Sequence, residues 1–399
     1  MNVGADALEA LTWLDDKQES MLGLIVELCD INSGTFNLDG LEKVRGRLVE
    51  EFSSLGGEIK IVDSQPWNTV DDRGEQEVGK SGPILHVTKW PDAEKKVMLC
   101  IHMDTVYGPD HPFQKCVTQE DGTVNGPGVI DAKGGIVVLL NALRALEASS
   151  FAGKVGWEVI LNSDEEIGSR GSDTFIRSRA PHCVAGLLFE PSLPDGTLVS
   201  WRKGSGNFAF VVRGKSAHTG RDFEKGRNAL AALSRLCVEI DELNTNPDIT
   251  YNVGRINGGG ALNAVPDLAV GRVNVRVVDN AQKKQVEEQF AALVQKYNQL
   301  DGISVEINGE FSSPPKPIDD GVRKMQNRIE SCGKALGMEI KWRGTGGASD
   351  GNRFAAAGLP NIDTLGPRGN HIHSDKEFLI PDSLVPRAKL AALVLLSFC

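Results

Sequence analysis

Residues 1–200 alternate between short apolar runs and stretches in which hydrophobic residues recur at helical spacing. Short apolar runs bounded by turn residues are typical of buried strands. Five segments have this pattern: 58–62, 84–88, 97–101, 157–162 and 186–189. Helical spacing occurs at 17–29, 41–52, 134–146 and 172–179. Alternating strands and helices predict an α/β fold with a largely parallel sheet, which leaves room for an antiparallel edge.

The pattern changes near Trp201. The next segments read as strand 207–212, helix 226–243, strands 250–256 and 269–278, helix 282–299 and strand 303–307. This β-α-β-β-α-β order is typical of a ferredoxin-like unit. A proline-rich connection, 312–318, then leads to helix 322–336, strand 339–342 and helix 353–357, which resume the first pattern. We therefore predict a small domain, 201–313, inserted into a large one made of 1–200 and 314–399.

Composition narrows the class of protein. The chain has 399 residues, enough for two or three domains, and a formal net charge of −11, which argues against nucleic acid or an anionic membrane as partner. Seven cysteines without a Cys-x-x-Cys motif favour a reducing compartment. Residues 1–18 lack a signal-peptide pattern, and apolar stretches such as 135–140 are too short to span a bilayer. We expect a cytoplasmic protein.

Acidic and imidazole side chains follow three of the predicted strands, at the points where these strands end. They are His102, Asp104, Glu165, Glu166 and Glu190. In an open parallel sheet, ligands bind beyond the carboxyl ends of the strands, so these groups should converge on one crevice. Packed together without a cation, the carboxylates would repel one another and lose solvation. A divalent metal resolves this conflict, and two metals resolve it better.

Taken singly, these motifs have simpler explanations. His102 near a strand end is often structural, although Asp104 could accept its second ring N–H. Asp131 before Gly134 could cap a helix, or its two oxygens could bridge two cations. Glu165 and Glu166 could form an exposed acidic turn. Alternatively, in an extended segment their side chains would diverge, so that one binds metal and the other takes a proton from a water.

Histidine- and glycine-rich loops supply further candidates. Residues 369–377 contain His371, His373 and Glu377, which are either surface groups or metal ligands. His218, within 214–220, lies in a hairpin loop or donates a hydrogen bond to a developing oxyanion. Gly346-Gly347 could present backbone N–H groups to a carboxylate, but the loop lacks the Walker lysine. No dinucleotide fingerprint follows a predicted strand in the sequence.

As an ordered set, these motifs resemble the dinuclear zinc aminoacylase and carboxypeptidase family, over about His86 to Leu379. The motifs are His102-Met-Asp, Gly126-Pro-Gly-Val-Ile-Asp-Ala-Lys-Gly-Gly, Asp164-Glu-Glu-Ile-Gly-Ser, Phe189-Glu-Pro-Ser, Gly214-Lys-Ser-Ala-His-Thr-Gly and His373-Ser-Asp-Lys-Glu. Thr345-Gly-Gly-Ala-Ser-Asp-Gly-Asn and Leu365-Gly-Pro-Arg-Gly-Asn look most like its glutamate carboxypeptidase branch. The resemblance implies a zinc-peptidase-type mixed sheet with an inserted ferredoxin-like lid that forms a homodimer.

The resemblance also implies a role for each site residue. The site would hold two zinc ions, for which cobalt or manganese could substitute. His102 and Glu190 would bind one ion, and Glu166 and His373 would bind the other. Asp131 would bridge the two ions, and its peptide bond to Ala132 would be cis. Glu165 would be the general base, and Asp104 would orient His102. In the lid, His218 would reach the partner's active site, Asn263 would bind substrate and Arg276 would bind its terminal carboxylate, a task that suits arginine. His371 is given no ligand role.

The sequence therefore predicts a metal-dependent hydrolase that releases a free amino acid from a C-terminal peptide or N-acyl bond. Its substrate would be a small peptide or an N-acyl amino acid, cleaved by a glutamate carboxypeptidase-like activity. An N-acyl-amino-acid deacylase or a dipeptidase would use the same site. A non-catalytic metal-binding dimer is the alternative from another class, and an unligated Glu165 argues against it because a scaffold needs no base.

Overall fold

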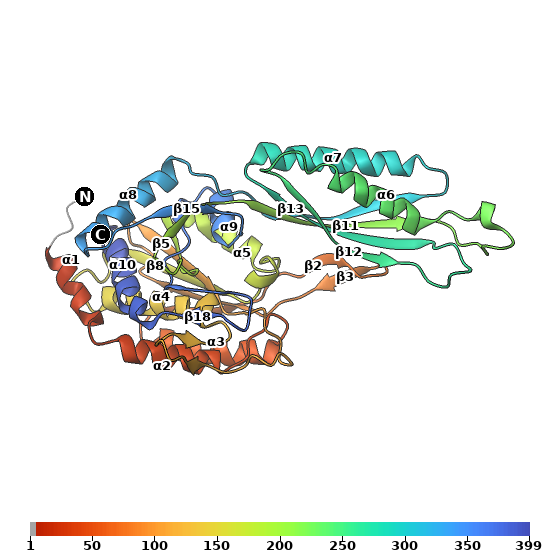
Figure 1. The fold of residues 1–399 in the computed structure, drawn as a ribbon. Helices are drawn as coiled ribbons and strands as arrows, with labels where there is room; N and C mark the ends of the chain where they lie inside the picture. Colours follow the sequence, from red (N-terminus) through yellow and green to blue (C-terminus); the bar gives the residue numbers. More distant parts are fainter. Residues whose placement is uncertain (1–4) are drawn as a thin grey trace.

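The computed structural model describes residues 5–399, so the first four residues of the predicted segment 1–200 lie outside it. A broad α/β body carries a long, narrower arm (Figure 1). The body is built on a six-stranded sheet in the order β1-β4-β8-β5-β9-β16. Its strands are β1 (Glu58–Val62), β4 (Ile84–Lys89), β5 (Lys96–His102), β8 (Gly156–Asn162), β9 (Ala185–Leu188) and β16 (Asn361–Ile362). The sheet is mixed, because β5 pairs in parallel with β8 and β9 whereas β4 pairs antiparallel with β1 and β8.

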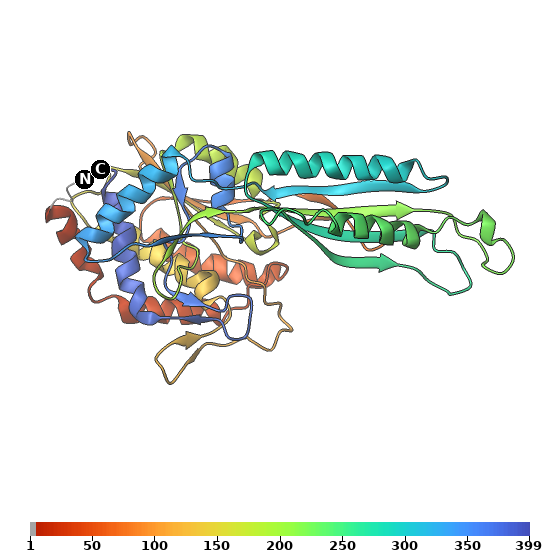
Figure 2. The same cartoon turned by 45° about the horizontal axis from the view of Figure 1, so that its top comes forward.

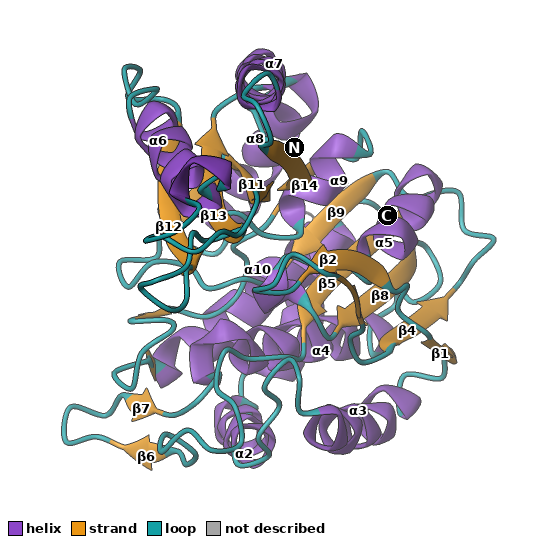
Figure 3. Cartoon of the chain, turned by 90° about the vertical axis from the view of Figure 1, so that its right-hand side faces the viewer, coloured by secondary structure: helices purple, strands orange, loops and turns teal. Residues whose placement is uncertain are grey.

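Helices cover both faces of this sheet (Figure 3). One face packs against α2 (Gln18–Cys29), α3 (Leu38–Ser53), α4 (Gly134–Glu147), α8 (Asp320–Ala335) and α10 (Leu384–Leu396), which share the main hydrophobic core. The other face packs against α5 (Asp173–Arg179) and α9 (Gly351–Ala356). Helix α10 was not predicted from the sequence. It is apolar on nearly all sides because it is buried beside α4, so it lacks the polar face that marks a surface helix.

The arm is a separate antiparallel sheet in the order β12-β13-β11-β14. Its strands are β11 (Gly204–Arg213), β12 (Thr250–Gly258), β13 (Leu268–Val277) and β14 (Ser304–Ser313). Helices α6 (Ala229–Asp241) and α7 (Asn280–Asn298) cover one face and share a second core with it (Figure 2). The predicted inserted ferredoxin-like fold is confirmed. The limits 1–200, 201–313 and 314–399 stay a prediction.

A hairpin that the sequence pattern did not reveal reaches from the body to the other face of this sheet (Figure 1). It consists of β2 (Trp67–Val70) and β3 (Gln76–Gly79). Val70 packs against Val211 and Val270 of the arm. Asp72, in the turn, pairs with Arg255 and lies 3.2 Å from Arg272. The hairpin therefore joins the body and the arm through both apolar and charged contacts.

One predicted strand was placed wrongly. Segment 339–342 was expected to be a strand, but β15 spans Trp342–Thr345 and pairs in parallel with β10 (Leu198–Arg202). The partner strand, at distant positions in the sequence, sets this register. The remaining strands, β6 (Val117–Thr118), β7 (Val124–Asn125), β17 (Gly369–Asn370) and β18 (Phe378–Leu379), form a small sheet, and the described part of the chain begins with α1 (Ala5–Glu9). Among residues 5–399, no helix has both the length and the apolar character that crossing a bilayer requires.

Candidate metal centre and active site

The five predicted metal ligands converge beyond the carboxyl ends of β5, β8 and β9. Candidate ligand atoms of His102, Asp131 and Glu190 all lie within 4.8 Å of one another. Those of Asp131, Glu166 and His373 form a second group with the same spread. Asp131 belongs to both groups. Each group therefore has the nitrogen and carboxylate donors that suit zinc and related divalent ions.

The two oxygens of Asp131 face different imidazoles. Its Oδ1 lies 3.1 Å from Nε2 of His102, and its Oδ2 lies 3.4 Å from Nε2 of His373. Glu190 Oε2 lies 3.8 Å from the first imidazole, and Glu166 Oε2 lies 3.1 Å from the second. The Asp131–Ala132 peptide is cis, as predicted. This arrangement is what a carboxylate that bridges two cations requires.

Electrostatics favour the binding of cations at this cluster. Burial and the charge of Asp131 raise the pKa of Glu166 to about 7. Burial also raises the pKa of Glu190 to about 8, although His102 opposes the rise. The pKa of Glu165 is raised well above its usual range by burial and by Glu190. Because divalent cations would relieve the crowding of these carboxylates, the residues present fit a pair of such ions.

Glu165 is not a member of either ligand group among the described residues. It begins a short 3₁₀ turn, so the extended segment expected for Glu165 and Glu166 was wrong. The backbone N–H groups of both residues donate to the carboxylate of Asp104, at 3.2 and 3.3 Å. The turn places Glu165 on the wall of the cavity that Asp131, Glu166, Glu190 and His373 also line.

Asp104 holds two parts of the site together. The backbone oxygen of Asp104 lies 2.9 Å from Nδ1 of His102, and its Oδ1 lies 3.4 Å from the same nitrogen. The hydroxyl of Thr35 donates to its other oxygen at 2.7 Å. The carboxylate therefore contacts both the imidazole and the turn that carries Glu165. Its predicted role of orienting His102 stays a prediction.

A buried glutamate that received no role from the sequence supports Asp131. The carboxylate of Glu377 accepts hydrogen bonds from the backbone N–H groups of Gly128, Ile130 and Asp131 at 3.0–3.2 Å, and from the hydroxyl of Tyr107 at 2.8 Å. Burial and Asp131 raise its pKa to about 7. The only sequence signal was its place in the His-Ser-Asp-Lys-Glu motif, which does not reveal the backbone partners.

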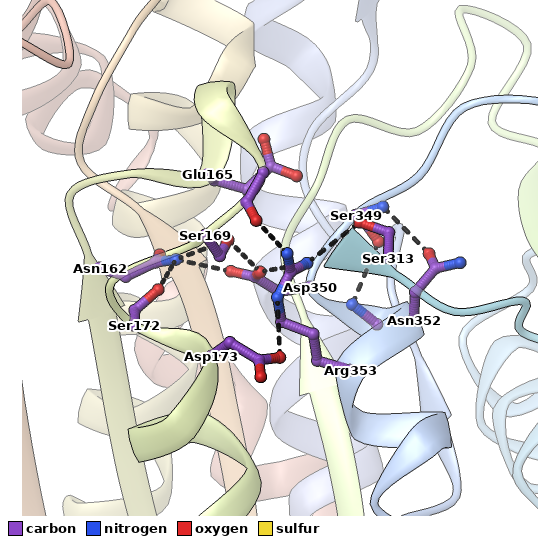
Figure 4. Close-up of polar contacts among 12 residues, drawn as sticks. Asn162, Glu165, Ser169, Ser172, Asp173, Ser313, Ser349, Asp350, Asn352 and Arg353 are labelled. Carbon is purple, nitrogen blue, oxygen red and sulfur yellow. Dashed lines mark hydrogen bonds and ion pairs between the residues drawn. The ribbon is translucent and has the colours of Figure 1, made fainter. Parts of the chain in front are cut away.

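A second buried network fixes the segment that follows Glu165 (Figure 4). Asp350, the N-cap residue of α9, accepts hydrogen bonds from Ser169 at 2.5 Å and from Asn162 at 2.8 Å. It also pairs with Arg353 at 3.3 Å. The carboxylate of Glu165 points away from this network (Figure 4). The network therefore supports the loop without occupying the carboxylate.

Four of the five predicted ligands, Asp131, Glu166, Glu190 and His373, line a cavity of about 530 Å³, here called the metal cavity. Arg276 and Gly347 line it, and Nη1 of Arg276 donates to the carbonyl oxygen of Gly346 at 3.4 Å. These three predicted substrate contacts therefore lie together. Arg202 and Arg343 also line the cavity and were missed, since nothing in their local sequence distinguishes them from surface arginines.

His218 and Asn263 lie elsewhere. Both are exposed, and the backbone oxygen of Asn263 accepts a hydrogen bond from Thr219 at 3.0 Å. They belong to loops at the end of the arm that points away from the body (Figures 1 and 2). Within residues 5–399, neither residue lines the metal cavity. One chain by itself does not bring them to the metal ligands.

The sequence of this chain is similar to those of known proteins. A family model described as Peptidase family M20/M25/M40 matches residues 98–397. Carboxypeptidase G2 of Pseudomonas sp. (strain RS-16) is 28% identical over 386 residues, which cover 93% of this chain and 87% of that protein. Succinyl-diaminopimelate desuccinylase of Pseudoalteromonas translucida (strain TAC 125) is 26% identical over 306 residues, which cover 71% of this chain and 78% of that protein.

Solved structures show the same fold. An M20 family metallo-carboxypeptidase from Sulfolobus solfataricus aligns with a TM-score of 0.71 and 18% identity, over 95% of this chain and 99% of that one. The resemblance drawn from the sequence motifs is thus confirmed over most of the chain. The chain belongs to peptidase family M20/M25/M40 and is a hydrolase of the metallopeptidase type.

Proposed function

We propose that the protein is a glutamate carboxypeptidase-like hydrolase that cleaves a C-terminal peptide or N-acyl amide bond and releases a free amino acid. The observation that carries this proposal is the position of Asp131 between two imidazoles, in a cavity that Arg276 also lines. A relative named carboxypeptidase G2 supports the same reaction class.

Binding in this proposal begins with the free carboxylate of the substrate. Arg276 offers a planar fork of N–H donors that matches a carboxylate, and Gly347 lines the cavity beside it. The carbonyl of Gly346 holds one arm of the guanidinium at 3.4 Å. The terminal carboxylate would therefore be fixed at one side of the cavity, with the amide bond directed toward Asp131.

His102, Asp131 and Glu190 would hold one divalent ion, and Asp131, Glu166 and His373 the other. When bound, zinc ions at these positions would polarise the amide carbonyl and make water more acidic. Glu165 takes the proton of the attacking water on its carboxylate and then delivers it to the leaving nitrogen. Asp104 holds the backbone of Glu165 in place for both transfers.

His218 would complete the site from a second subunit. We propose that the arm, about residues 201–313, pairs two chains and carries His218 to the neighbouring cavity, together with Asn263. There the imidazole would donate a hydrogen bond to the oxyanion that forms at the amide carbon. Residues near Trp201 and the Pro-rich 314–317 would serve as hinges for closure.

An N-acyl-amino-acid deacylase is the second candidate, and the relative named a desuccinylase favours it. The values of kcat/KM for a panel of dipeptides, N-acyl amino acids and N-acyl glutamates distinguish the two activities. We expect hydrolysis that a chelator abolishes and that added zinc, cobalt or manganese restores. If no member of the panel is hydrolysed by the zinc-loaded protein, the proposed reaction is wrong.

A further inference from the structure

A second cavity adjoins the metal cavity. It has a volume of about 790 Å³ and lies between the open face of the arm sheet, the β2–β3 hairpin and the loop after Glu166. Four residues line both cavities: Gly168, Asn207, Asn274 and Ser312. The two spaces are therefore parts of one trough, which continues past the metal ligands. We call the second part the Arg170 cavity, after a residue on its wall.

Strand β13 runs along this trough. Arg272, Asn274 and Arg276 alternate with valines that pack into the core of the arm, so these three side chains share the open face. Arg276 lines the metal cavity, Arg272 lines the Arg170 cavity and Asn274 lines both. Arg272 and Arg276 are four positions apart along the strand, which corresponds to about 13 Å. A ligand bound at Arg276 could therefore extend toward Arg272.

The Arg170 cavity carries an excess of positive charge. Its wall includes five arginines, namely Arg170, Arg177, Arg255, Arg272 and Arg353, against the two acids Asp173 and Glu310. Four of the arginines have acidic partners, because Asp72 pairs with two of them and Asp173 lies within 3.8 Å of the other two. No hydrogen bond or ion pair links the side chain of Arg170 to any residue from 5 to 399.

Arg170 is half-buried. The residues on both sides of it are anchored, since Ser169 donates to Asp350 at 2.5 Å and Gly171 donates its N–H to Asp164 at 2.6 Å (Figure 4 shows the first contact). Burial lowers the pKa of Arg170, Glu310 opposes this and the like charge of Arg272 adds to it. An unpaired guanidinium in this position gains free energy from an anionic partner.

We propose that the Arg170 cavity is a subsite for a second anionic group of the substrate, a carboxylate carried on the acyl or N-terminal side of the scissile amide. This inference rests on the proposed function, which puts the other carboxylate at Arg276. The substrate class is then an N-acyl or peptidyl amino acid with an acidic group at each end. The trough, the spacing along β13 and the unpaired guanidinium all fit such a molecule.

Two series of N-acyl glutamates test the proposal. One series carries straight acyl chains of four to twelve carbons, and the other carries the same chains with a terminal carboxylate. For each chain length, kcat/KM of the member with the terminal carboxylate is divided by kcat/KM of the member without it. This ratio should peak at one chain length. Arg170→Gln should lower that peak by roughly tenfold or more, as the loss of a charge-assisted hydrogen bond does. Arg170→Lys should recover part of it. The exposed Arg323→Gln on α8 is the matched control and should keep the peak.

A ratio that does not vary with chain length, or a peak that Arg170→Gln leaves intact, would overturn the subsite. Direct binding separates this failure from failure of the proposed reaction. Calorimetry compares free suberate with free octanoate on the metal-loaded protein. Even if neither acyl series is hydrolysed, tighter binding of suberate that Arg170→Gln removes supports the subsite. Equal binding of the two acids to both proteins refutes it.

Discussion

Asp131 is a buried carboxylate and Glu165 a half-buried one, and their neighbours shift their pKa values in opposite directions. Burial opposes ionisation of Asp131, but His102 and His373 together hold its pKa below its usual range. Glu165 faces Glu190 and Glu166 instead, which add to the effect of burial and raise its pKa. Asp131 therefore keeps its negative charge to lower pH than an ordinary aspartate, whereas Glu165 binds a proton more readily than an ordinary glutamate.

Replacement of Glu165 by glutamine keeps its shape and removes the proton acceptor. General acid–base groups contribute about 10²–10⁴-fold to rate. We expect kcat to fall by at least this much, while metal content measured by atomic emission stays at the wild-type value. A variant with near-normal turnover would show that Glu165 is not the base.

Glu377→Gln tests the support beneath Asp131. In the wild type, three backbone N–H groups and one hydroxyl donate to the two carboxylate oxygens. A glutamine amide has only one oxygen to accept these hydrogen bonds, so the segment around Asp131 should shift. Such supporting changes typically weaken metal binding by about 10–100-fold. Competition titration with a metal-binding dye measures the affinity. The exposed Asp375→Asn, two residues away, should bind metal as the wild type does, and equal affinity in both variants contradicts the assignment.

Asp363 joins three elements of the structure. It follows β16, and its Oδ2 accepts from Arg202 in β10 and from Lys316 in the connection after β14, both at 2.8 Å. All three side chains are buried. Arg202 also donates to the carbonyl of Gly347 at 3.1 Å, so the pairing reaches the wall of the metal cavity. The carboxylate therefore fixes the base of the arm against the main sheet.

Asp363→Asn should destabilise the fold, because it leaves two buried cations without a counter-charge. Breaking a buried pair in this way costs about 3–5 kcal/mol. Urea unfolding gives the free energy of unfolding, and the exposed Asp92→Asn serves as control. A loss of less than about 1 kcal/mol for Asp363→Asn, similar to a surface substitution, would contradict this assignment.

Asp363 should also make the free energy of unfolding depend on pH. Burial opposes ionisation of Asp363, but Arg202 and Lys316 lower its pKa to about 2, below the ordinary 3.8. A carboxyl group whose folded pKa is depressed adds stability above the unfolded pKa and loses it as the pH falls. The difference in unfolding free energy between the wild type and Asp363→Asn should therefore be constant above about pH 4 and shrink toward pH 2. A difference that grows in acid would show that the ion pair is not its source.

At the scale of the whole molecule, the arm separates His218 from the metal ligands of its own chain. The loop that carries it lies at the far end of the arm sheet, whereas all five predicted ligands lie in the body (Figure 1). Hinge motion within one chain, or the arm of a second chain, must therefore bring the imidazole to the site if it acts in catalysis.

Mixing two inactive variants decides between these arrangements. In a dimer of His218→Ala and Glu165→Gln chains, action across the interface gives one site with both defects and one with neither. Activity should then recover to about a quarter of the wild-type value when the chains exchange freely. Differently tagged chains show whether the subunits exchange. If they exchange and activity does not recover, His218 acts in its own chain's site or has no role in catalysis.

Much of the site could be predicted because its signals are local. Most of the predicted ligands follow apolar runs, and the order of the motifs along the chain matches a known family. Glu377, Asp350 and Arg202 were not assigned because their partners are far away in the sequence. Glu377 bonds to backbone groups almost 250 positions earlier, and Asp350 bonds to Ser169 and Asn162. No local pattern in the sequence encodes such contacts.

By itself, the sequence determined most of the long strands and helices, the inserted ferredoxin-like unit and the candidate ligands. These depend on hydrophobic periodicity and on residue type at strand ends, which act over a few residues. Tertiary structure decided that Asp131 faces two imidazoles, that the β2–β3 hairpin packs on the arm and that Arg170 has no partner. Those features depend on contacts between segments that are far apart in the sequence, and such contacts form only in the folded chain.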